Sequence, residues 1–179
     1  MEDSLVIRQP NRRGVAAVEL CAVMMFFMMP LLFSVLEAGR LIQVQQILSN
    51  GCRDGARLAS QGYTVSLTGA PTQIMVSTGG SNIHDAIFQY LVAAGFNNLT
   101  SADVVVTFTF TSAKADGTFP TEPYQGEKGE KFNVTVSIPW SKVRWVNLGF
   151  INPTTLTYTV TWQMLVDDKF TVNDTLPVW

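Results

Sequence analysis

The chain has 179 residues, a formal net charge of −2 at pH 7, and 47% apolar against 15% charged residues. This length holds one domain and an anchor, but not two full domains. The charge balance gives no electrostatic basis for binding nucleic acid. One His and two Cys argue against a His/Cys metal cage. We therefore expect neither a metal nor a cofactor, and we look for the function in the apolar part of the sequence.

An apolar run extends from Val15 to Leu36, and its single charged residue is Glu19. At about 1.5 Å per residue, a helix over this run measures about 33 Å, enough to cross a hydrocarbon core of roughly 30 Å. Pro30 predicts a bend and not an end, because transmembrane helices tolerate proline. A secretory signal peptide is the alternative, but its apolar region is shorter, about 7–15 residues, and ends in a small-x-small site that is absent here. We predict a transmembrane helix over residues 15–37.

Three arginines, Arg8, Arg12 and Arg13, precede the apolar run. The positive-inside rule places this basic side of the helix in the cytoplasm. We therefore predict a cytoplasmic leader over residues 1–14, a single crossing of a membrane, and a C-terminal part outside the cytoplasm, periplasmic or extracellular if the protein is bacterial. A carboxylate in such a helix costs about 2.5–3.5 kcal/mol on insertion scales and calls for a partner. For Glu19 the alternative is snorkelling toward the lipid headgroups.

Helical character continues beyond the membrane, because apolar residues recur at three- and four-residue steps over residues 38–62. Residues 49–51 (Ser-Asn-Gly) are expected to loosen this amphipathic extension, and Gly62 to end it. A second amphipathic helix is predicted over residues 83–94, with Asn82 as its N-cap. The outer half of the long helix must then cover an apolar surface.

The head, residues 63–179, begins with a loop that holds one short strand at residues 73–77, and then contains the second helix. Period-two alternation follows in three stretches: residues 104–110, 132–138 and 156–164. Apolar residues on one face and threonines on the other imply an antiparallel sheet with one buried and one wet face. The predicted fold is α+β: a long N-terminal transmembrane and amphipathic helix, then a small head with one further helix and an antiparallel sheet of about three strands.

The connection over residues 139–155 sets Trp140, Trp145 and Phe150 among basic residues. Aromatics between basic residues bind glycan, lipid or single-stranded nucleic acid in some proteins. Trp and Arg are also typical of subunit contacts. We take the three aromatic residues as candidates for an interface, with a buried turn as the alternative.

The cysteines and the histidine point to no catalytic centre. Cys21 lies about 46 Å from Cys52 along a continuous helix, so the two cannot pair. Cys21 is expected to fill apolar space. Cys52 would face an oxidising compartment, where it either links two subunits or stays a free thiol. No motif places a Ser or Cys nucleophile near His84, which is expected to be a solvated residue in the first turn of its helix. We expect no enzymatic activity.

Three motifs carry a resemblance to a known family: Arg12-Arg13-Gly14-Val15-Ala16-Ala17-Val18-Glu19, Glu37-Ala38-Gly39-Arg40, and Gly51-Cys52-Arg53-Asp54-Gly55-Ala56-Arg57. With the Pro-interrupted apolar run between the first two, they closely resemble the TadE-like group of the Tad (tight adherence, Flp) pilus system. Leu20 and Ala38 stand where members of the group often have an aromatic residue. This departure is expected to change peptidase efficiency or helix packing without changing the class.

The resemblance implies that a membrane prepilin peptidase cuts after Gly14 on the cytoplasmic side and leaves Val15 as the new N-terminus. Glycine offers no side chain to obstruct a peptidase working on extended backbone. Glu19 would then be the fifth residue, and its carboxylate would meet the terminal ammonium of an adjacent subunit, so that two charges that are expensive singly in lipid become a pair.

For the whole protein, the resemblance implies a minor pilin or pseudopilin-like component of a Tad-type pilus and type II-like secretion assembly, acting in pilus biogenesis and surface adhesion. Its partners would be the prepilin peptidase, other pilin-like subunits, the Tad secretion platform and the inner membrane. The alternative is a signal-anchored periplasmic domain that binds a glycan or a protein and never polymerises.

Overall fold

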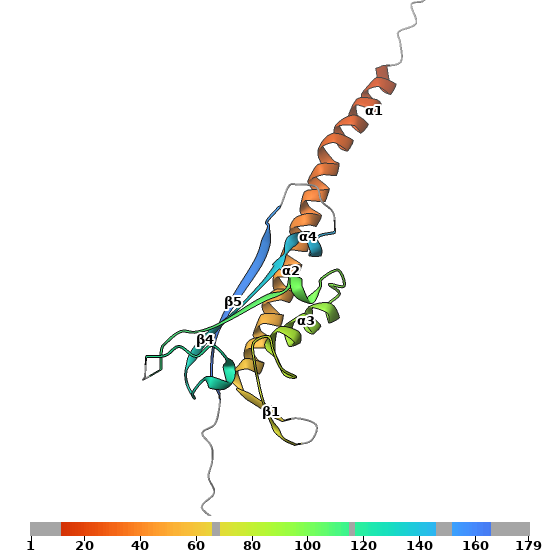
Figure 1. Cartoon of the computed structure of the whole chain (residues 1–179). Coiled ribbons are helices and arrows are strands. Elements are labelled where there is room, and N and C mark those ends of the chain that lie inside the picture. Colours follow the sequence, from red (N-terminus) through yellow and green to blue (C-terminus); the bar gives the residue numbers. More distant parts are fainter. Residues whose placement is uncertain (1–11, 66–68, 115–116, 146–151, 166–179) are drawn as a thin grey trace, which may run out of the picture.

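One long N-terminal helix runs through the molecule, and the head packs around its second half (Figure 1). The computed structural model describes residues 12–65, 69–114, 117–145 and 152–165. The helix consists of α1 (Arg12–Val23), a π-helical turn (Met24–Met28) and α2 (Met29–Ser60), which follow one another without a break. Its segment Gly14–Ser60 is long and apolar enough to cross a membrane, and none of its most apolar stretch is buried against the rest of the protein.

The π-helical turn explains how the helix accommodates Pro30. Proline has no N–H, and its ring clashes with the carbonyl four residues earlier, which belongs to Phe26. A π turn widens the backbone at that carbonyl and so relieves the clash. Ser34 Oγ donates to the carbonyl of Pro30 at 2.8 Å. We predicted a bend at Pro30; the structure has a local change of helix type there, and the helix continues.

The prediction that residues 49–51 loosen the helix is wrong. Gly51 lies inside α2, where helix α3 (Ile83–Ala93) packs closely against it. A Cβ added to Gly55 would lie 2.5 Å from Cδ1 of Ile87, and one added to Gly51 would lie 3.0 Å from Cδ1 of Tyr90. These glycines therefore serve helix–helix packing. The predicted end is confirmed: α2 stops at Ser60, and Gly62 follows with a φ of 66°.

Helix α3 has the predicted ends. The side chain of Asn82 accepts a hydrogen bond from the backbone N–H of Asp85 at 2.6 Å, which satisfies one of the free donors of the first turn. Gly95, with a φ of 99°, follows the last residues of the helix. Between α2 and α3 lies an antiparallel hairpin of β1 (Tyr63–Val65) and β2 (Pro71–Gln73). The predicted strand at residues 73–77 is therefore shifted.

The main sheet is antiparallel, with strand order β3 (Val105–Phe110), β4 (Lys131–Pro139) and β5 (Thr155–Gln163). Single 3₁₀ turns lie at Ser101–Asp103 and Pro123–Gln125, and a short helix, α4 (Trp140–Val143), follows β4. Phe108 pairs with Val134, which pairs with Val160. The three strands occupy the stretches predicted from their alternation.

The core lies between the sheet and the outer half of the long helix. Helix α2 packs against β4 and β5, and α3 packs against α2 and β3. The core side chains of β4 are fully buried: Phe132, Val134, Val136 and Ile138. Hydrogen bonds link hydroxyl groups across the opposite, wet face, where Thr135 and Thr159 lie 2.9 Å apart. The predicted α+β fold is confirmed, with α4 and the β1–β2 hairpin in addition.

Candidate functional site

The first half of the long helix has no cover within the described part of the chain. Every residue from Gly14 to Phe33 is exposed, and Phe26 and Phe27 are 76% and 71% exposed. In the second half, Val44, Leu48 and the residues that follow on the same face are buried in the core of the head. One helix thus has an apolar half without contacts and a half that the head surrounds.

The predicted cleavage and pairing residues lie together at the start of this exposed half. Gly14, Val15 and Glu19 border one shallow hollow on the surface of α1. A Cβ added to Gly14 would meet no atom within 4 Å. Among the described residues, no hydrogen bond or ion pair reaches the carboxylate of Glu19. Arg12 and Arg13 begin α1, whereas Arg8 lies outside the described residues.

A second feature lies where the exposed half of the helix meets the head. A cavity of about 80 Å³, which we call the exit pocket, opens between α2 and the segment around α4. Its walls are Phe33, Leu36, Glu37, Arg40, Trp140, Arg144 and Trp145. Glu37 is only 7% exposed, and no described residue makes a hydrogen bond to either oxygen of its carboxylate. The indole N–H of Trp140, another wall residue, is also buried and has no acceptor among the residues that the structure describes.

Arg40 holds the two sides of the exit pocket together. Its Nε donates to the carbonyl of Val143 at 3.0 Å, and its Nη1 donates to Gln43 Oε1 at 3.0 Å. The guanidinium lies 4.7 Å from the ring centre of Trp145 and 5.2 Å from that of Phe96. Partial burial lowers the pKa of Arg40 from its ordinary value, but a guanidinium stays protonated in proteins. A cation therefore lies one helical turn from the buried carboxylate.

The three aromatic interface candidates have different outcomes. Trp140 is fully buried. For this residue the alternative of a buried turn is therefore correct, and a surface contact is not. Trp145 is 71% exposed at the edge of the exit pocket. Phe150 lies outside the described residues. The sequence analysis did not single out Glu37 as a site residue, although a charge directly after an apolar run was a signal for it.

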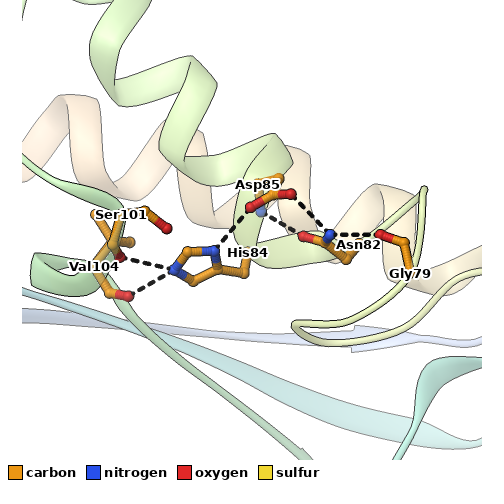
Figure 2. Close-up of polar contacts among 6 residues, drawn as sticks. All are labelled: Gly79, Asn82, His84, Asp85, Ser101 and Val104. Atoms are coloured by element: carbon orange, nitrogen blue, oxygen red, sulfur yellow. Dashed lines mark hydrogen bonds and ion pairs between the residues drawn. The ribbon is translucent and has the colours of Figure 1, made fainter.

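His84 lies in the first turn of α3, as predicted, but its side chain is only 16% exposed and makes contacts within the head. Figure 2 shows its ring between α3 and the turn that leads into β3. Nδ1 is 3.1 Å from Asp85 Oδ1, and Nε2 is 3.0 Å from the carbonyl oxygens of both Ser101 and Val104. The hydrogen bond from Asn82, and then that from His84, lowers the pKa of Asp85. These contacts fasten α3 to the sheet, which is a structural role.

Cys52 lies on the face of α2 that packs against the sheet. Its side chain is buried, and its Sγ donates to the carbonyl of Val134 at 3.2 Å. Burial raises the pKa of this thiol to about 11, against smaller opposing effects of a backbone hydrogen bond and Arg53. The alternative of a free thiol is therefore correct for Cys52. Cys21 is also a free thiol and is exposed on the apolar half of the helix.

The fold and the site together define the class: an α+β head built on the outer half of an N-terminal apolar helix whose inner half is free to contact lipid or other helices. Residues 14–57, which form most of the long helix, match the model of the family described as TadE-like protein. This match confirms the resemblance found in the sequence motifs of the helix. The match ends before the head begins. No curated protein and no solved structure matches the chain.

Proposed function

We propose that this protein is a minor, pilin-like subunit of a Tad-type pilus, anchored in the inner membrane by the segment 15–37 and processed after Gly14. The observation that carries the proposal is the family match over residues 14–57, which covers Gly14, the apolar helix and the acid within it. The role is assembly and adhesion, without catalysis. The head would lie on the periplasmic side or, after assembly, on the pilus.

The environment of Glu19 supports assembly through the helix. The carboxylate is exposed on an apolar surface, and the described part of the chain supplies no counter-ion. A charge in lipid needs a partner, and a neighbouring chain is a possible source of one. Cleavage after Gly14 would create a new ammonium at Val15, four residues before Glu19 on the same face of the helix. The ammonium of one subunit and the carboxylate of the next would then neutralise each other in a shared apolar layer.

The shape of the molecule supports the same role. The exposed half of the helix offers apolar side chains on all sides, as expected for a segment surrounded by lipid or by neighbouring helices. The outer half is locked into the head by buried contacts along α2. Packing of the inner halves would therefore bring the heads into a fixed array.

The identity of the first residue of the membrane-extracted protein tests processing. We expect Val15 at the N-terminus in a cell that holds the prepilin peptidase, and Met1 when the peptidase is deleted. Gly14→Leu should block cleavage. Gly39→Leu is the matched control, because Gly39 is also an exposed helical glycine with no atom near an added Cβ, and it should be cut normally. A wild-type protein that keeps Met1 beside an active peptidase would contradict the proposal.

Incorporation into pili tests the pairing role of Glu19. Glu19→Gln removes the charge and keeps the shape, so membrane insertion should persist while the protein disappears from sheared pilus fractions. Normal incorporation of this variant would argue against charge pairing. The alternative, a signal-anchored binding domain that never polymerises, predicts Met1 at the N-terminus and no effect of either Gly14→Leu or Glu19→Gln.

A further inference from the structure

The exit pocket contains a buried charge that the described part of the chain leaves uncompensated. Glu37 is more than nine-tenths buried, and within the described ranges neither of its carboxylate oxygens has a partner. Buried carboxylates in proteins are normally paired or hydrogen-bonded, because removing them from water without compensation is strongly unfavourable. The pocket wall also contains the unpartnered indole N–H of Trp140. Two unsatisfied groups of opposite hydrogen-bonding character therefore border one cavity.

The polar groups in the pocket wall indicate which kind of ligand would fit the cavity. Glu37 needs a cation or a strong donor. The guanidinium of Arg40 has further N–H groups besides those that bind Val143 and Gln43, and together with the guanidinium of Arg144 it favours an anion. The Trp140 N–H needs an acceptor. A matching ligand carries a positive and a negative group a few bonds apart. A lone lysine side chain of a neighbour would satisfy Glu37 but would also be repelled by the two arginines.

The position of the pocket favours a lipid as the source of such a zwitterion. The continuous run of exposed apolar residues on the helix ends at Leu36, directly before Glu37, and only Ile42 follows as an exposed large apolar residue of the helix. This level of the helix coincides with the headgroup layer if the segment 15–37 crosses a bilayer. Phe33 and Leu36 belong both to the apolar surface and to the pocket wall. Trp145, which is exposed beside Arg40, has the amphipathic character typical of membrane interfaces.

We propose that the exit pocket binds the headgroup of an aminophospholipid of the phosphatidylethanolamine class, with the ammonium on Glu37 and the phosphate on the side of Arg40 and Arg144. A cavity of about 80 Å³ has room for such a group, because a single water needs only about 10–15 Å³ of the same measure. The acyl chains would lie along the exposed apolar half of the helix. The inference rests on the membrane anchor within the proposed function, but not on cleavage or polymerisation.

Lipid retention by the full-length protein tests this site. The purified protein in detergent is offered equal amounts of phosphatidylethanolamine, phosphatidylcholine and phosphatidylglycerol with identical acyl chains, and bound lipid is counted by native mass spectrometry. Phosphatidylcholine has the same charges but no N–H donor. A charge-assisted hydrogen bond corresponds to a preference of about ten-fold or more, so we expect phosphatidylethanolamine to be retained at least about ten-fold over phosphatidylcholine.

Two variants with the same change of charge make the test specific. Glu37→Gln should reduce the preference for phosphatidylethanolamine to nearly one, with an unchanged thermal midpoint or a raised one, since the variant removes a buried charge. Asp54→Asn, on the exposed face of the same helix, should keep the preference of the wild type. An alkaline carbonate wash of the membrane fraction shows whether a variant is still inserted, because a protein that has lost its membrane insertion is released by the wash.

Three results would overturn the proposal. Equal retention of the three lipids by the wild type would mean that ordered water fills the pocket. A preference for phosphatidylglycerol that survives Glu37→Gln would mean general attraction to the arginines. Chemical crosslinking of the wild type and of Glu37→Gln gives the third result. If the variant loses dimers that the wild type forms, while its lipid retention is unchanged, the carboxylate binds a neighbouring subunit and not a lipid. Retention of Met1 would refute the pilin role and leave the lipid preference standing, so the two proposals fail independently.

Discussion

Replacing Gly55 by alanine tests the close packing of α2 against α3. The new Cβ would lie 2.5 Å from Cδ1 and 2.7 Å from Cγ1 of Ile87, and 3.0 Å from Cγ2 of Ile83. Carbon atoms in good contact are about 3.5–4.0 Å apart, so α3 must withdraw by about 1 Å or Ile87 must leave its rotamer. Ile83 and Ile87 are fully buried, which leaves them little space to move. Overpacking of this kind typically costs about 1–3 kcal/mol.

The same substitution also has a favourable term, which a control removes. Alanine is better than glycine in a helix interior by about 1 kcal/mol, so Gly55→Ala should lower the free energy of unfolding by a net of about 0–2 kcal/mol. Gly39→Ala has the favourable term alone, because no atom lies within 4 Å of its Cβ. The two variants should therefore differ by about 1–3 kcal/mol in favour of Gly39→Ala.

Thermal unfolding of the full chain in detergent, followed by near-ultraviolet circular dichroism, measures this difference. At about 2–4 °C per kcal/mol, the midpoint of Gly55→Ala should lie about 2–12 °C below that of Gly39→Ala. Adding Ile87→Val to Gly55→Ala removes the closest methyl group and should recover part of the loss, a non-additive result that reports direct contact. Equal midpoints for the two alanine variants would refute the argument that Gly55 is required for the approach of α3.

Three further predictions concern the head. Burial raises the pKa of Cys52 to about 11, so a thiol reagent at pH 8 should label Cys21 and leave Cys52 unmodified until denaturant is added. The free energy of unfolding should decline as the pH rises from about 9 towards 11, because the thiol loses its proton first in the unfolded chain. Rapid labelling of both cysteines in the native protein would contradict the buried position of Cys52. Asn82→Ala should lower the free energy of unfolding by about 1 kcal/mol through loss of the N-cap, and denaturant titration with an unchanged midpoint would speak against it. The pKa of Asp85 is lowered, first by the hydrogen bond from Asn82, so this carboxylate stabilises the fold above its ordinary pKa of about 4 and loses that contribution as pH falls further; the melting temperature of Asp85→Asn should depend less on pH between 5 and 2.5 than that of the wild type.

Local patterns predicted most of the architecture because each predicted element carries its own periodicity. The alternation along β3, β4 and β5 specified which side chains face the core, and Asn82 with Gly95 marked the ends of α3. The family motifs located Gly14 and Glu19, whose spacing is purely sequential. These features depend on residues that are close together in the chain, so they can be recognised without a tertiary structure.

The features that the sequence analysis did not predict depend on tertiary contacts. A glycine inside a helical pattern is locally a weak point, and only the approach of Ile87 and Tyr90 shows why Gly51 and Gly55 are small. The exit pocket joins residues near position 37 to residues near position 140, and no periodicity connects the two segments. The burial of Trp140 depends on the same meeting of α2 and α4.

The continuity of α1, the π turn and α2 has a mechanical consequence. The helix that would occupy the bilayer is also the central support of the head, with no linker between the two roles. Turning the anchor about its own axis must therefore turn the head by the same angle, and sliding it along the membrane normal must raise or lower the head by the same distance. A neighbouring subunit that binds the anchor would in this way fix the direction in which the threonine-lined face of the sheet points, without contacting the sheet itself.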